Sequence, residues 1–243
     1  MQLTWNGQAG TGQQGLKTAL AGECHPGKIV ENTVVSVRPW ACASNQGLTA
    51  VEMNAAVRIY TQAFDNCYSL SLVSFPKCDQ IWQDAFRNCT ALTTVSFPAC
   101  TVIDNDAFLN CIALSAVNIP ECRVIGNRTF GNCTTLAEAD FPKCTDILGS
   151  AFSNCYELRT INCPVCSNIV AFAFARCSAL IALYLTSVSA VTRLGAYAFY
   201  STPIGGYSDI AGQYGSVYVP TSLYDQFIVA TNWTSISSRI VPV

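Results

Sequence analysis

The apolar residues change their spacing partway through a unit that repeats along most of the chain. Within one unit, Phe86, Cys89 and Leu92 are three residues apart, whereas Val95 and Phe97 alternate with polar neighbours. A spacing of three favours a single tight helical or 3₁₀ turn. Strict alternation favours a short strand with one buried face. Each unit therefore predicts a coil with a strand on one side and a helical turn on the other.

The unit is 22 residues long. One phenylalanine marks it at Phe64, Phe86, Phe108, Phe130, Phe152 and Phe174, and again at Phe199 after a longer step of 25 residues. With a less regular copy at residues 41–59, seven copies run from residue 41 to about 197, followed by a partial one. A single coil cannot bury its own apolar side, so neighbouring coils must stack.

In letters, the unit is A-F-x-N-C-x-x-L-x-x-V-x-F-P-x-C-x-x-I, as in residues 85–103. It resembles the BspA-type leucine-rich repeats, which carry L-x-x-V/I-x-I/F-P, then I, then A-F-x-x-C. The resemblance covers residues 41 to about 200 and departs from the family in the cysteine after the proline, Cys100 in this copy. It implies an α/β fold, a curved right-handed leucine-rich-repeat solenoid of 22-residue coils with a parallel sheet. It also implies a bacterial surface or secreted protein that binds other macromolecules.

The two ends of the chain differ from the repeat. We expect an N-terminal cap or flexible lead-in at 1–40, the solenoid of about seven repeats at 41–199, and a C-terminal cap at 200–243. Within the last region, Val217–Val219 predicts a strand, followed by a proline, a helix with Ser222 at its N-cap, and a final strand. Caps are expected because a terminal coil otherwise leaves its interior open to water.

Cysteine recurs every eleven residues and follows the repeat. The series is Cys67, Cys78, Cys89, Cys100, Cys111, Cys122, Cys133, Cys144, Cys155, Cys166 and Cys177. In a stack of coils these residues form two columns that point into the core, so we predict buried, reduced thiols. Disulfides and metal binding are the alternatives. The C-x-x-C at 163–166 is a redox or zinc pattern, but the repeat also explains it, because Cys163 takes a strand position that phenylalanine holds in other copies.

Asparagine precedes the first cysteine of five successive units, at Asn66, Asn88, Asn110, Asn132 and Asn154. A catalytic site has no use for five such residues. We interpret the column as a structural ladder whose amides hydrogen-bond backbone groups in the turns.

Composition and charge narrow the functional classes. Charged residues are 12% of the chain, the net charge is −2, and there is no run of Lys or Arg, so no nucleic-acid surface is expected. No apolar run approaches the roughly 18 residues of a membrane span, so membrane insertion is not expected. Residues 1–40 lack the pattern of a signal peptide. A secreted or cell-surface location therefore follows from the resemblance alone.

Two short motifs at the N-terminus suggest chemistry in isolation. Residues 10–15, G-T-G-Q-Q-G, match a dinucleotide-binding pattern, but no βαβ unit comes after them. Cys24 and His25 are adjacent, and neighbours in sequence rarely have the geometry of a nucleophile and its base. We therefore expect no enzyme activity, no cofactor and no metal site.

The outward positions of the strands carry the candidate ligand site. They are small in most copies, which suits a merely solvated sheet. The later copies differ and carry Asn118, Glu138, Asp140, Asn162 and Tyr184. On adjacent strands, about 4.8 Å apart, these would form one polar patch with an aromatic edge. We hypothesise that this patch, on the concave face, binds a protein or glycan in a non-catalytic binding or adhesion module. The alternative is a structural spacer or stalk of a cell-surface or virion protein without a ligand of its own.

Overall fold

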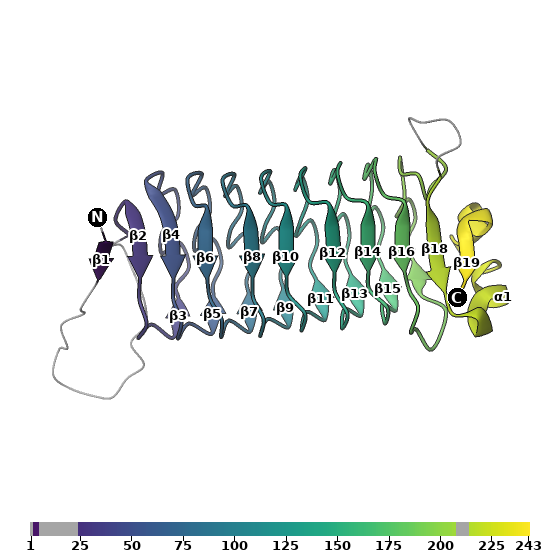
Figure 1. The fold of residues 1–243 in the computed structure, drawn as a ribbon, viewed down its shortest axis with the longest axis horizontal. Coiled ribbons are helices and arrows are strands. Elements are labelled where there is room, and N and C mark those ends of the chain that lie inside the picture. Colours follow the sequence, from purple (N-terminus) through teal and green to yellow (C-terminus); the bar gives the residue numbers. More distant parts are fainter. Residues whose placement is uncertain (1, 5–23, 208–213) are drawn as a thin grey trace.

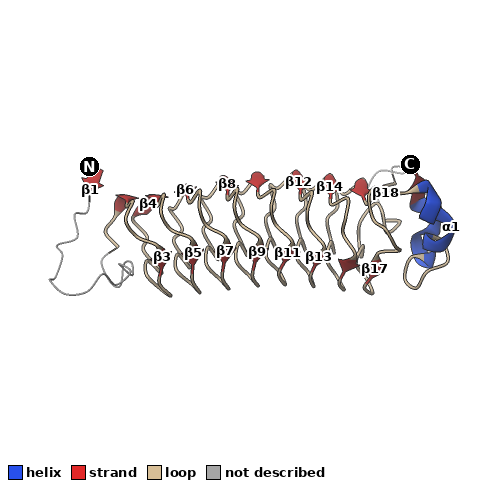
Figure 2. Ribbon diagram, turned by 90° about the horizontal axis from the view of Figure 1, so that it is seen from below, coloured by secondary structure: helices blue, strands red, loops and turns tan. Residues whose placement is uncertain are grey.

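The repeating units form the coils of an elongated solenoid of parallel strands, as predicted (Figure 1). The computed structural model describes residues 2–4, 24–207 and 214–243. Two rows of strands run along opposite edges of the stack, and each coil within residues 27–194 contributes one strand to each row (Figure 2).

The predicted alternating segments form most of the first row, and two strands at residues 2–4 and 27–30, outside those segments, begin it. Its strands are β1 (Gln2–Thr4), β2 (Gly27–Val30), β4 (Leu48–Glu52), β6 (Leu72–Ser74), β8 (Thr94–Ser96), β10 (Ala116–Asn118), β12 (Glu138–Asp140), β14 (Thr160–Asn162), β16 (Ala182–Tyr184), β18 (Ser216–Val219) and β19 (Ile240–Pro242). All pairings between them are parallel, with equivalent residues of successive units opposite one another. Val95 and its equivalents point inward, whereas Thr94 and Ser96 are exposed.

The second row consists of two-residue strands that the sequence pattern did not predict. They are β3 (Ser36–Val37), β5 (Arg58–Ile59), β7 (Gln80–Ile81), β9 (Val102–Ile103), β11 (Val124–Ile125), β13 (Asp146–Ile147), β15 (Asn168–Ile169) and β17 (Arg193–Leu194). These strands form one continuous parallel sheet. A two-residue segment is too short to show alternation. The repeat therefore predicts only the buried isoleucine of this segment and not the strand.

The predicted helical turn is instead a chain of β-turns. Around Phe86, amide groups bond to carbonyls three residues back, from Cys89 to Phe86 and from Leu92 to Cys89. Asp84 and Asn88 interrupt any helix because both adopt positive φ, at 55° and 60°. The spacing of three between apolar residues therefore indicates successive β-turns and not a 3₁₀ turn. Helix occurs, among the described residues, only near the C-terminus.

Aromatic rings fill the centre of the stack. Phe86 and Phe108 lie parallel with their ring centroids 5.2 Å apart, and the pair of Phe108 and Phe130 is next at 5.5 Å. A second column passes through Phe75 and Phe97 at 6.1 Å. All of these rings are fully buried, so each coil stabilises the next through the same contact.

The C-terminal segment folds beside the last coil. After β18 it forms the 3₁₀ turn η1 (Thr221–Leu223), the short helix α1 (Tyr224–Phe227), the 3₁₀ segment η2 (Thr234–Arg239) and β19. The predicted order of strand, proline, helix and strand is confirmed. The predicted N-cap is wrong: α1 begins after Leu223, directly from η1, and no side chain caps either element.

Candidate functional site

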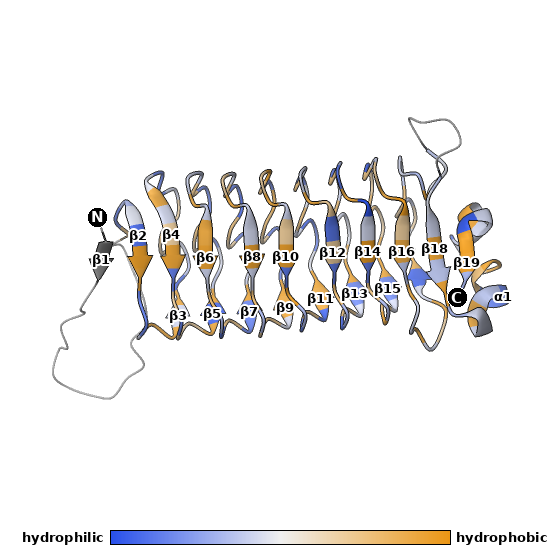
Figure 3. Ribbon diagram, in the orientation of Figure 1, coloured by the Kyte–Doolittle hydropathy of each residue, from blue (hydrophilic) through white to orange (hydrophobic). Residues whose placement is uncertain are grey.

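The residues of the predicted patch lie outward on neighbouring strands. Asn118, Glu138, Asp140 and Asn162 are exposed, and Tyr184 is half-buried. In the parallel register Asp140 is opposite Asn162, and Asn162 is opposite Tyr184. Figure 3 shows β12 as strongly hydrophilic, because both of its outward residues are carboxylates. We call the four residues Asp140, Asn162, Tyr184 and Tyr218 the outer row.

Side chains along the outer row contact one another. The Asn162 Nδ2 group donates to Oδ1 of Asp140 at 2.8 Å. Asn118, one strand earlier, donates from Nδ2 to the hydroxyl oxygen of Ser96 at 3.1 Å. Asn118 therefore bonds away from Asp140, and the two amides do not join a single chain of hydrogen bonds. Oδ2 of Asp140 and Oδ1 of Asn162 take no part in this bond, and both residues are exposed, so each oxygen can accept a bond from a ligand.

An aromatic pair forms one end of the outer row. The rings of Tyr184 and Tyr218 stack with centroids 4.8 Å apart and planes 10° apart. Tyr218 was not predicted as a site residue, although the alternation of Val217, Tyr218 and Val219 contains the signal, because two buried valines flank an outward position. The pair offers a flat, amphipathic surface next to amide and carboxylate groups.

The regularly spaced cysteines are buried and free, as predicted. In one column the thiol donates to the carbonyl of a phenylalanine one coil earlier, for example Cys89 Sγ to Phe64 O at 3.2 Å. Burial raises the pKa of the Cys111 thiol to about 12 and that of Cys67 to about 11. A neutral, inaccessible thiol is neither a nucleophile nor a metal ligand.

The C-x-x-C at 163–166 has a structural explanation in the fold. The Cys163 amide donates to Tyr184 O at 3.2 Å, just as the Phe97 amide donates to Asn118 O at 3.0 Å. Cys163 therefore holds the phenylalanine position of its strand. Thiol hydrogen bonds with Cys166 raise the pKa of both Cys144 and Cys163.

Cys24 is bonded to Cys42 in a disulfide, with Cα atoms 5.2 Å apart. The sequence pattern did not predict this bond, because both residues lie outside the series of eleven. The bond removes Cys24 as a candidate nucleophile beside His25. The glycine motif at 10–15 lies outside the described residues.

The asparagine column is a ladder, with partners other than those predicted. Asn88 Nδ2 donates to Asn66 Oδ1, and Asn110 Nδ2 to Asn88 Oδ1, both at 2.7 Å. The amides bond one another and not the backbone, because the positive φ of each asparagine stacks its side chain directly on the equivalent one in the next coil. Asparagine tolerates this conformation better than other residues with a side chain.

Two further properties concern the described part of the chain. No group of three or more His, Cys, Asp or Glu side chains in it is arranged to hold a metal ion. No helix in it is long and apolar enough to cross a membrane.

Comparison with known proteins identifies the repeat. A model of the BspA type leucine-rich repeat region, in six copies, matches residues 28–137 and 101–208. A search of curated proteins found no match. Among solved structures, a leucine-rich repeat protein of T. pallidum is 25% identical with a TM-score of 0.57, covering 76% of this chain and 85% of that one. A leucine-rich cell surface protein of Faecalibacterium prausnitzii is 20% identical with a TM-score of 0.46, covering 75% and 68%. The stacked 22-residue coils and the family match together show that the chain belongs to the BspA-type leucine-rich repeat family.

Proposed function

We propose that the protein is a non-catalytic binding module that recognises a protein or a glycan through the strand face around Asn118, Glu138, Asp140, Asn162 and Tyr184. The observation that carries the proposal is the outer row. Adjacent parallel strands align a carboxylate, an amide and two stacked tyrosines in one line. Binding surfaces favour aromatic residues beside polar groups.

A location on the cell surface or outside the cell is part of the proposal. Membership of the BspA-type family supports it, because the family implies bacterial surface or secreted proteins. The Cys24–Cys42 disulfide supports it independently, because such bonds persist in oxidising compartments.

The spacer role has one observation in its favour. The sheet from β3 to β17 and the phenylalanine column continue without interruption through the stack, as in a rigid rod. A rod without a ligand does not need the clustering of polar and aromatic groups on the later strands.

The test is a screen on a glycan array and a displayed peptide library, followed by replacement of Glu138, Asp140 and Tyr184 together by alanine. Affinity for the ligand found should fall at least about tenfold. The matched control replaces Leu72, Ser74 and Thr94, outward residues of β6 and β8, and should bind normally. Equal affinity of both triple variants would refute the patch, and a screen without any ligand would favour the spacer.

A further inference from the structure

Main-chain hydrogen bonds join the turns of successive coils in a fixed pattern. The amides of Asp84, Phe86 and Asn88 donate to three alternate carbonyl oxygens of the next coil, at 3.1, 2.8 and 2.8 Å. The same three bonds recur in seven consecutive coils, from the coil of Trp40 to the coil of Phe172. Each turn therefore presents a row of three donors, and the next coil supplies the acceptors.

The last coil breaks this pattern. Its equivalent donors are the amides of Tyr197, Phe199 and Ser201, and none of them has an acceptor among the residues that the structure describes. Neighbouring carbonyl groups of the last coil do have hydrogen-bond donors. Asn232 Nδ2 donates to Leu194 O, and Trp233 Nε1 to Thr192 O, both at 2.7 Å.

The C-terminal segment thus replaces only part of a missing coil. Trp233 also lies against Phe199, with centroids 6.4 Å apart, and so ends the phenylalanine column. This segment ends the ring stack and donates to carbonyls at β17, whereas three turn amides have no acceptor in the described part of the chain. We call this side of the last coil the open edge. Unpaired backbone amides next to a protein surface are ready donors for a ligand.

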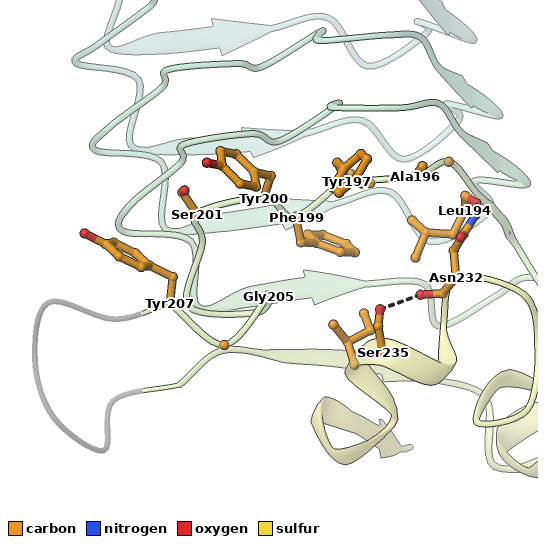
Figure 4. A pocket seen from close by; sticks show the side chains of 14 residues that line it. Leu194, Ala196, Tyr197, Phe199, Tyr200, Ser201, Gly205, Tyr207, Asn232 and Ser235 are labelled. Atoms are coloured by element: carbon orange, nitrogen blue, oxygen red, sulfur yellow. Dashed lines mark hydrogen bonds between the residues drawn. The ribbon is translucent and has the colours of Figure 1, made fainter.

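A pocket of about 830 Å³ lies at this open edge, between the last coil and η2 (Figure 4). Its size is in the range of ligand pockets, roughly 300 to 1,000 Å³. The 14 residues that line it are all uncharged, and they include Tyr197, Tyr200, Tyr207, Asn232 and Ser235. Tyrosine, serine, glycine and asparagine are the residues that antibody binding sites use for adaptable recognition.

Exposed aromatic rings lie beside the pocket. Tyr197 is 66% exposed, and its φ of 57° is the positive φ that the equivalent residue adopts in the other coils, such as Asp84 and Phe172. Its ring stacks on Phe172 at 5.4 Å and meets Tyr200 edge-on at 6.4 Å. The rings therefore offer a partner an exposed aromatic surface beside the three amides.

We propose that this pocket binds an uncharged segment of a partner polypeptide, whose alternate carbonyl oxygens accept the amides of Tyr197, Phe199 and Ser201. The molecule itself shows seven times which groups pair with such a row, namely alternate carbonyls of a polypeptide turn. Main-chain pairing of this kind supplies affinity, and the surrounding tyrosines supply selectivity. The site lies on the turn edge of the stack and is independent of the outer row.

The probe for this site is a blocked peptide with the sequence of residues 149–154, GSAFSN. It is uncharged, and in the native stack its carbonyls accept the amides of Arg128, Phe130 and Asn132. Titration into ¹⁵N-labelled protein should shift the amide resonances of Tyr197, Phe199 and Ser201 saturably. Ser235→Trp, which places a ring in the pocket, should raise the dissociation constant at least about tenfold.

Two controls keep the result interpretable. Tyr68→Ala removes another exposed tyrosine, 45% exposed, in a different coil and should bind the peptide normally. Tyr197→Ala gives a second pocket variant in case Ser235→Trp fails to fold by circular dichroism. The proposal is overturned if the three amides do not shift, or if the pocket variants bind as well as the wild type. It is also overturned if neutral oligosaccharides, and not the peptide, shift these amides.

Discussion

The inside of the coils and the outer face of their strands differ in how far their residues repeat from one coil to the next. Inside, the same residue types recur in the same contacts, as in the stacked pair of Phe86 and Phe108. Outside, equivalent positions differ from coil to coil, for example Ser96 on β8, Asp140 on β12 and Tyr184 on β16. Each coil must present the same inner surface to the next one, whereas the outer positions are not part of the shared core and can differ between coils. The difference separates stability from recognition.

The largest loss of stability is expected from substitutions inside the coils. Phe108→Ala should lower the free energy of unfolding by about 3 to 5 kcal/mol, because a buried ring leaves a cavity between two neighbouring rings. Phe130→Ala should behave alike. Urea denaturation measures the change, with the exposed Tyr156→Ala as the control expected near zero. A loss under about 1 kcal/mol for either phenylalanine would contradict the buried column.

The asparagine ladder should give the next largest effect. Asn110→Ala removes the bonds to Asn88 and Asn132 and forces alanine into a φ of 62°. We expect a loss of about 2 to 3 kcal/mol in the free energy of unfolding. Asn110→Gly is the matched control, since glycine adopts this φ freely, and it should lose about 1 kcal/mol less. If the two variants were equally stable, the left-handed conformation would not be part of the ladder's role.

The thiols should give a smaller effect per pH unit, at alkaline pH. The folded protein keeps its Cys111 proton up to a pKa of about 12, whereas the unfolded chain loses it near the ordinary value of 9.0. The folded state then binds more protons than the unfolded state, so stability falls as pH rises from about 9 to 12. Cys111→Ala should make this fall shallower by about 1.4 kcal/mol per pH unit. Identical slopes for variant and wild type, from denaturation at several pH values, would contradict the burial of this thiol.

Counting reactive thiols distinguishes the free cysteines from the two in the disulfide. The folded protein should show few reactive groups, and the denatured protein should show twelve without reductant, the number of free cysteines. Reduction should add Cys24 and Cys42. A markedly lower count in denaturant before reduction would indicate disulfides between the columns.

The sequence predicted the features that the repeat imposes and failed where the repeat stops. The 22-residue repeat was sufficient to predict the coils and the burial of the thiols, and the resemblance to the BspA-type repeats implied the parallel strands. It did not predict the disulfide of Cys24, which lies outside the array and forms through tertiary contact alone. The open edge at Tyr197 could not be predicted from the sequence for a related reason. Whether a backbone donor of the last coil is paired depends on how the C-terminal segment folds against it, and no residue pattern encodes that.

The central claim is that recognition resides on the outer strand face. The most direct test is chemical labelling of carboxyl groups in the protein with and without its ligand. Glu138 and Asp140 are exposed and should react with a water-soluble carbodiimide and amine in the free protein. With the ligand from the screen bound, their labelling should fall at least about fivefold, because a bound partner excludes reagent and solvent from its contact surface. Glu157 and Asp225, exposed elsewhere, should label equally in both states. Unchanged labelling of Glu138 and Asp140 in a saturated complex would contradict the claim.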